Sequence, residues 1–175
     1  MLGIIFKIRN NLNMSSLKII YYSFVFPYLK YGILFWSSCS QNLFNRIFIL
    51  QKKILRCINF RGRHDHTEPI FRENEILKLV DIKFLEICKF IFLDLNQNNL
   101  FELVSYEQIH GYETRNRDNL ARVQTYTRTA ELFFLNRGLI YYNSLDNSIK
   151  CSPNVFSFKF KLRSFLLSQY SSIID

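Results

Sequence analysis

The sequence predicts a mainly α-helical protein, with a small helical bundle followed by a helical C-terminal extension. Apolar residues recur every three or four positions in several segments, which is the period of a helix buried on one side. Hydrophobic residues make up 49% of the 175 positions, enough for a packed core. Only residues 120–129, rich in Thr and Tyr, alternate somewhat, so at most one short strand or hairpin is expected there.

The first strongly helical segment is predicted from Leu17, with Ser15 or Ser16 as its N-cap. Its apolar positions are Leu17, Ile20, Tyr21, Phe24, Tyr28 and Tyr31. Pro27 lies inside this pattern and lacks an amide donor, so it should kink or divide the helix. Gly32 is a second weak point.

A second helix is predicted over residues 41–59. Its apolar stripe consists of Leu43, Ile47, Leu50, Ile54 and Cys57. Arg46, Lys53 and Arg56 are spaced at i, i+7 and i+10, so they should share another face of the helix. That face is expected to be open to solvent.

Further helices are predicted towards the C-terminus. Thr67 can cap a short one, Asp81 a longer one, and residues 130–142 should form another. The last helix should start at Ser152 and Pro153, a favourable cap followed by proline at the first helical position. Its inward residues are predicted to be Val155, Phe158, Leu162, Phe165 and Leu166.

Positive charge is concentrated in the first 63 residues. They hold ten of the 23 Lys and Arg residues and none of the 14 Asp and Glu residues, so the remainder is close to neutral. Ordinary helix surfaces mix both signs, and a basic module without acidic neighbours is typical of a polyanion-binding surface. We therefore expect nucleic acid as the partner, although an ordinary solvated face stays an open alternative.

The candidate phosphate-binding residues all come from this basic stretch. They are Lys7, Arg9, Arg46, Lys52, Lys53, Arg56, Arg61 and Arg63. Because phosphate contacts carry no base information, binding should not depend on nucleotide sequence.

No catalytic residue, metal or cofactor is predicted. The chain lacks a phosphate-binding glycine loop, and the pair His64 and His66 has no nearby cysteine or histidine to complete a metal site. Nucleotidyl transfer by two metal ions needs closely placed carboxylates, and no Asp-Asp pair occurs.

Several blocks resemble the C-terminal part of the reverse transcriptase of LINE-type (non-LTR) retrotransposons, especially the jockey and CR1-like groups. Residues 17–36 (LKIIYYSFVFPYLKYGILFW) are similar to the family block LYYSLIYPYLTYGIxxWG, and residues 43–56 to its LQKRAIR helix. Other similar blocks follow in the family's order at residues 66–71, 76–81, 110–115, 128–129, 138–145 and 157–162. Departures include Ser37, Tyr142 and Asp146, where the family usually has Gly, Trp and Pro.

The resemblance implies a fragment that lies downstream of the polymerase palm. Residues 1–62 would be a thumb-like module that holds the template–primer duplex, and residues 63–175 a C-terminal extension packed against it as one unit. The family uses Mg²⁺, but the palm aspartates that bind it are missing, so no polymerase activity is expected from this chain alone. A separate upstream palm and fingers region is a further expected partner.

Three alternatives stay open. The chain could be a non-catalytic helical protein-interaction module, or a decayed relic without a nucleic-acid role. It could also associate with a membrane through residues 19–36, but Lys30 and four tyrosine hydroxyls interrupt that stretch, so no membrane partner is expected. The four widely spaced cysteines and the lack of a signal-peptide pattern predict an intracellular protein, in nucleus or cytoplasm.

Overall fold

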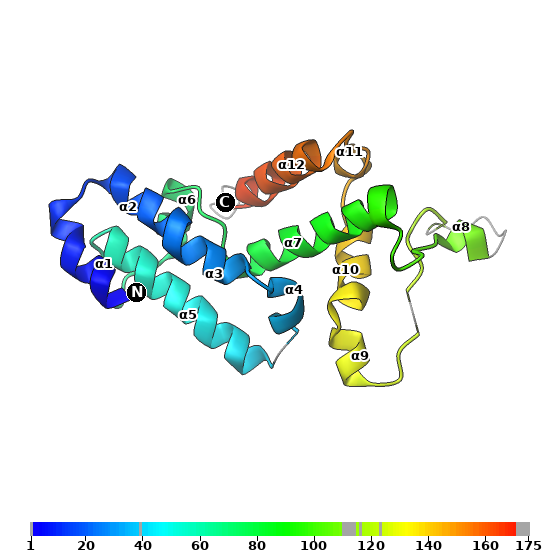
Figure 1. Ribbon diagram of the computed structural model, residues 1–175, viewed down its shortest axis with the longest axis horizontal. Helices are drawn as coiled ribbons and strands as arrows, with labels where there is room; N and C mark the ends of the chain where they lie inside the picture. The colour runs from blue at the N-terminus through cyan, green and yellow to red at the C-terminus, as the bar shows by residue number, and fades with distance from the viewer. Residues whose placement is uncertain (1, 39, 110–114, 116, 123, 171–175) are drawn as a thin grey trace. The chain divides into compact units, whose positions relative to one another are not determined.

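The computed structural model describes residues 2–38, 40–109, 115, 117–122 and 124–170 (Figure 1). The described chain is mainly α-helical, which confirms the predicted fold class. It divides into two compact units, of which unit 1 comprises residues 1–83 and 166–175 and unit 2 comprises residues 84–165. The domain boundary predicted after residue 62 therefore falls inside unit 1.

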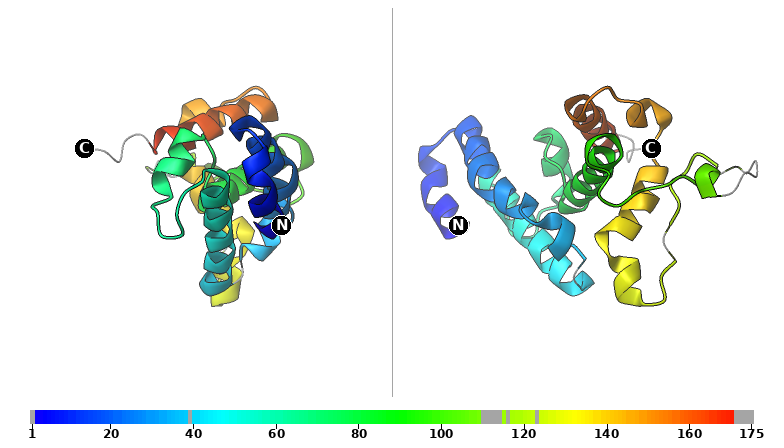
Figure 2. Two further views of the ribbon diagram at one scale, coloured as in Figure 1. Left: turned by 90° about the vertical axis from the view of Figure 1, so that its left-hand side faces the viewer. Right: turned by 45° about the vertical axis from the view of Figure 1, so that its right-hand side comes forward.

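Unit 1 is built around one long helix. In both views of Figure 2, α5 runs beside the helices formed by residues 14–30. The elements are α1 (Leu2–Ile8), η1 (Arg9–Asn11), α2 (Met14–Ile20), η2 (Tyr21–Val25), α3 (Phe26–Lys30), α4 (Ile33–Trp36), α5 (Gln41–Ile58), α6 (Glu68–Glu73) and the start of α7 (Leu79–Leu93).

The helical run from α2 to α3 begins earlier than predicted. Asn13 is the N-cap, and its Oδ1 accepts a hydrogen bond from the Ser16 amide at 2.8 Å, so neither Ser15 nor Ser16 caps the helix. Asparagine caps as well as serine does, which is why residue type alone did not locate the start. Pro27 was predicted to kink or divide this helix. The structure has a π-helical turn, η2, before α3, and Pro27 lies in the first turn of α3.

Gly32 ends this run, as its predicted weakness suggested. Its φ of +62° lies in the left-handed region, where a side chain would be strained. Trp36 closes the turn, because its Nε1 donates to the Tyr31 carbonyl at 2.8 Å.

A buried glutamine joins three parts of unit 1. Gln51 of α5 is fully buried, and its Nε2 donates to the Tyr21 hydroxyl and to the Leu77 carbonyl, each at 2.9 Å. Its Oε1 accepts from the Leu79 amide at 2.9 Å. Because the side-chain nitrogen and oxygen of Gln51 both have hydrogen-bond partners, this polar side chain fixes η2, α5 and the start of α7 against one another.

The apolar stripe predicted for α5 is partly wrong. Leu43 and Leu50 are 49% and 52% exposed, whereas Ile54 and Cys57 are buried as predicted. The buried face of α5 carries Phe44, Gln51, Ile54, Leu55, Cys57 and Ile58. The helix has apolar residues on two adjacent faces, and periodicity alone cannot decide which one packs.

Tyr170, the last described residue of unit 1, packs on the start of α7. Tyr170 accepts a hydrogen bond from the Lys78 amide at 3.0 Å and donates one to the Asp81 carboxylate. Burial raises the pKa of Asp81. Because α7 begins at Leu79, Asp81 lies in its first turn and is not the cap that the sequence predicted.

Unit 2 contains the rest of α7 and a set of shorter helices. They are η3 (Asp94–Asn98), α8 (Tyr106–Ile109), α9 (Arg128–Leu132), α10 (Phe134–Asn143), α11 (Asn147–Lys150) and α12 (Val155–Ser168), which ends in unit 1. Phe92 stacks on Phe158 with ring centroids 4.4 Å apart. Gly138 lies so close to α7 that an added Cβ would be 2.6 Å from both Ile87 and Ile91.

Several local predictions for unit 2 need correction. The predicted helix over residues 130–142 is two helices, because the extended Phe133 (ψ 139°) separates α9 from α10. Asn154 bonds the Ser157 amide at 2.8 Å and starts α12 at Val155, later than the predicted Ser152 and Pro153.

The described part of residues 120–129 forms no strand. Its ladder pairing is an isolated antiparallel bridge between Ser105 and Leu120. The Asn143 side chain binds the Leu120 main chain twice. Its Oδ1 accepts from the Leu120 amide at 2.9 Å, and its Nδ2 donates to the Leu120 carbonyl at 3.0 Å. Within the described residues, no helix combines the length and the apolar character needed to cross a membrane.

Candidate nucleic-acid interface

A pocket of about 680 Å³ in unit 1 collects most of the predicted phosphate-binding residues. Its walls come from α1 and η1, the C-terminal half of α5, and the loop that follows α5. The basic residues that line it are Lys7, Arg9, Lys53, Arg56, Arg61 and Arg63. We call this set the basic pocket.

Helix geometry explains how two of these cations come together. Lys53 and Arg56 are three residues apart on α5, so they are neighbours on one face. Lys7 reaches the same place because α1 packs against α5. The pocket therefore combines charges that are almost fifty residues apart in the chain.

A tight turn after α5 brings the loop cations back. Phe60 adopts φ +54°, and the Arg61 amide donates to the Arg56 carbonyl at 2.9 Å. The Asp65 carboxylate accepts from the Gly62 amide at 2.7 Å, and the Asp65 carbonyl accepts from Arg56 Nε at 2.8 Å. These contacts hold Arg61 and Arg63 beside the end of the helix.

Arg9 is held by a hydrogen bond and by two aromatic rings. Its Nη1 donates to the Cys57 carbonyl at 3.3 Å, and its guanidinium lies 4.3 Å from the Phe6 ring centroid and 5.1 Å from that of Phe60. Its buried Nε has no hydrogen-bond partner among the described residues. Fixing the guanidinium in advance reduces the entropy lost when it binds an anion.

The basic pocket is not neutralised by acidic side chains. In the described part of the chain, none of its six cations forms an ion pair with a carboxylate. The carboxylate of Asp65 is engaged by the backbone of its own loop. Uncompensated charges of one sign in a concave site focus a positive potential that attracts anions.

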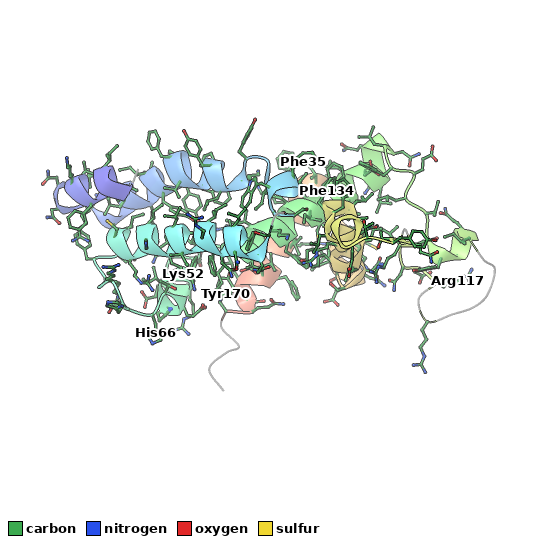
Figure 3. The ribbon with its side chains drawn as sticks, turned by 90° about the horizontal axis from the view of Figure 1, so that it is seen from below. Phe35, Lys52, His66, Arg117, Phe134 and Tyr170 are labelled. Carbon is green, nitrogen blue, oxygen red and sulfur yellow. The ribbon has the colours of Figure 1, made fainter. Side chains whose placement is uncertain are left out.

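Two predicted residues lie outside the basic pocket. Lys52 is half-buried, with its Nζ 4.3 Å from the centroid of the Phe48 ring (Figure 3). Arg46 is exposed on α5, two turns before Lys53, and a rise of 1.5 Å per residue places it about 10 Å further along the axis. Arg46 can extend the basic surface, whereas Lys52 belongs to another face.

His64 also lines the basic pocket. From the sequence it was considered only as a metal ligand together with His66, and not as a phosphate-binding residue. A smaller pocket of about 360 Å³ shares Arg61 and His64 and adds Asp65 and His66. Figure 3 labels His66. No group of three or more His, Cys, Asp or Glu side chains suited to a metal ion occurs among the described residues. The position of His64 directly after Arg61, Gly62 and Arg63 was the signal that could have identified it.

The chain matches no protein-family model, no curated protein and no solved structure. A proposal for its function therefore starts from the geometry and charge of the basic pocket.

Proposed function

We propose that this chain binds nucleic acid through the phosphate backbone, with the basic pocket as the main contact. The observation that carries the proposal is the gathering of six cations without carboxylate partners in the described structure. Four of the six are arginines, whose planar guanidinium groups suit bidentate contacts with phosphate oxygens. The contacts involve no base edges, so binding is independent of sequence.

The resemblance to retrotransposon reverse transcriptases supports an RNA/DNA template–primer as the nucleic acid. On this proposal the chain is a catalytically incomplete fragment of an RNA-directed DNA polymerase. Its basic helical module holds the duplex, and the polymerase chemistry belongs to a palm that this sequence does not contain. The proposal requires no cofactor for binding.

A salt titration tests the proposal. Fluorescence anisotropy of a labelled RNA/DNA hybrid should show affinity that falls steeply with salt, with a log–log slope near −0.9 for each phosphate contacted. Hybrids of unrelated sequence should give the same slope and affinity. Failure to bind any hybrid at low salt would contradict the proposal and favour a relic without a nucleic-acid role.

A second candidate function is a protein-interaction module. It is favoured by large apolar side chains on residues 19–35 of unit 1 that are well exposed. They include Ile19, Tyr28, Tyr31 and Phe35, which are 65%, 76%, 85% and 70% exposed. Clustered exposed apolar residues often mark protein interfaces, such as one for a palm and fingers region. A defined dimer in light scattering, without affinity for hybrid, would support this function instead.

A further inference from the structure

We infer that the basic pocket recognises a single nucleotide bearing a terminal phosphate, such as the 5′-phosphorylated end of a strand. This inference rests on the proposed function and specifies its ligand. It follows from the shape of the site, its charge density and the chemistry of its walls.

The shape of the site suits one nucleotide. A volume of about 680 Å³ lies within the range of pockets that enclose small organic ligands. A duplex presents its phosphates in a regular row along each strand, and a row of cations along a helix face would follow them. Here six cations surround one volume, and Arg46, which would extend the row, lies outside it.

The six positive charges of the site exceed the single negative charge of one internal phosphate. A phosphodiester carries a single negative charge, whereas a phosphate monoester carries about −1.5 to −2 at pH 7 and has three acceptor oxygens. Arg61 and Arg63 come from a loop and Lys53 from α5, so donors approach from different directions. A terminal phosphate satisfies more of these donors than an internal one.

The walls of the pocket are not uniformly polar. Phe6 and Cys57 contribute apolar surface beside the cations. The Arg9 guanidinium lies over one face of the Phe6 ring, and the residue is still 58% exposed. An exposed aromatic ring is a stacking platform for a base of any type. The site therefore pairs a phosphate-binding part with a base-binding part. Inorganic phosphate would occupy only the phosphate-binding part.

The test compares four probes on the full-length chain at one salt concentration. They are a 5′-phosphorylated single strand, the same strand with a 5′-hydroxyl, a closed dumbbell duplex without ends, and free dATP as a competitor. We expect the 5′-phosphorylated strand to bind about tenfold or more tightly than the 5′-hydroxyl strand, which corresponds to about 1.4 kcal/mol or more. Lys7→Gln and Arg63→Gln should remove this preference, and Lys52→Gln should keep it.

The other results are distinct. Displacement of the strand by dATP at lower concentration than by unlabelled strand supports the same chemistry and identifies a free nucleotide as its source. If the dumbbell binds as tightly as the phosphorylated strand and dATP does not compete, the inference is overturned while backbone binding stands. Binding of dATP without binding of any polynucleotide would reject the proposed function and retain the nucleotide site. No binding of any probe would reject both.

Discussion

Arg9 donates a hydrogen bond from Nη1 to the main-chain carbonyl of Cys57, across 48 residues of sequence. The contact fastens the start of η1, directly after α1, to the C-terminal half of α5, and both elements line the basic pocket. The rings of Phe6 and Phe60 lie against the same guanidinium. One side chain thus supplies both a charge to the site and a link between the elements that form it.

Replacing Arg9 with lysine should separate these two roles. The positive charge remains, but an ammonium cannot reproduce the fork and the planar ring contacts. We expect Arg9→Lys to lower the free energy of unfolding by about 1–2 kcal/mol, from one hydrogen bond and the cation–π contacts. Urea denaturation followed by circular dichroism measures the effect. Arg46→Lys, at an exposed position on α5, is the control and should change stability by less than about 0.5 kcal/mol.

Gln51 should be essential to unit 1. Gln51→Leu removes both side-chain donors and the acceptor, which leaves the Tyr21 hydroxyl, the Leu77 carbonyl and the Leu79 amide buried without that partner. We expect a loss of about 2–4 kcal/mol in unfolding free energy. The control Gln41→Leu alters an exposed glutamine on the same helix and should be close to neutral. Equal stability of the two variants would show that the buried bonds contribute nothing.

Gly138 should not tolerate a larger residue. A Cβ there would lie 2.6 Å from side-chain atoms of Ile87 and Ile91, so Gly138→Ala should push α10 away from α7. The expected cost is about 1–2 kcal/mol, because overpacking outweighs the better helix propensity of alanine. At Gly3 an added Cβ meets no atom within 4 Å, so Gly3→Ala should be neutral or slightly stabilising. Thermal unfolding of both variants checks the difference in sign.

Tyr142 should make unit 2 sensitive to alkaline pH. Burial raises the pKa of Tyr142 from 10.0 to about 12. Between these values the unfolded chain has released the proton that the folded chain still holds, so stability present below pH 10 is lost as the pH rises towards 12. Tyr142→Phe cannot titrate and should lose less stability than wild type over that range. Tyr126→Phe, at a residue 88% exposed, should behave like wild type in the same urea series.

Charge counting and helical period anticipated much of the architecture, because both act locally. The acid-free stretch alone predicts Lys7, Lys53, Arg61 and Arg63 as phosphate contacts, and the structure places all four in one pocket. The helix break at Gly32 also follows from a single residue type.

The features that the sequence did not indicate depend on distant partners. Gln51 is an ordinary polar residue on a helix until Tyr21 and the backbone at residues 77–79 meet it. Leu50 satisfies the apolar period, yet packing selected the neighbouring face. The Lys52 ammonium lies over the ring of Phe48, four residues earlier on the same helix. This spacing allows the two side chains to meet but does not require it.

The pair Lys52 and Lys53 gives the most direct test of the central claim, that the basic pocket binds phosphate. The two lysines have the same charge and adjacent positions on α5, but only Lys53 lines the pocket. Salt titrations of hybrid binding should show that Lys53→Gln reduces the steepness of the log–log slope by about one phosphate contact, while Lys52→Gln leaves it unchanged. Equal slopes for both variants, or a larger loss for Lys52→Gln, would contradict the account.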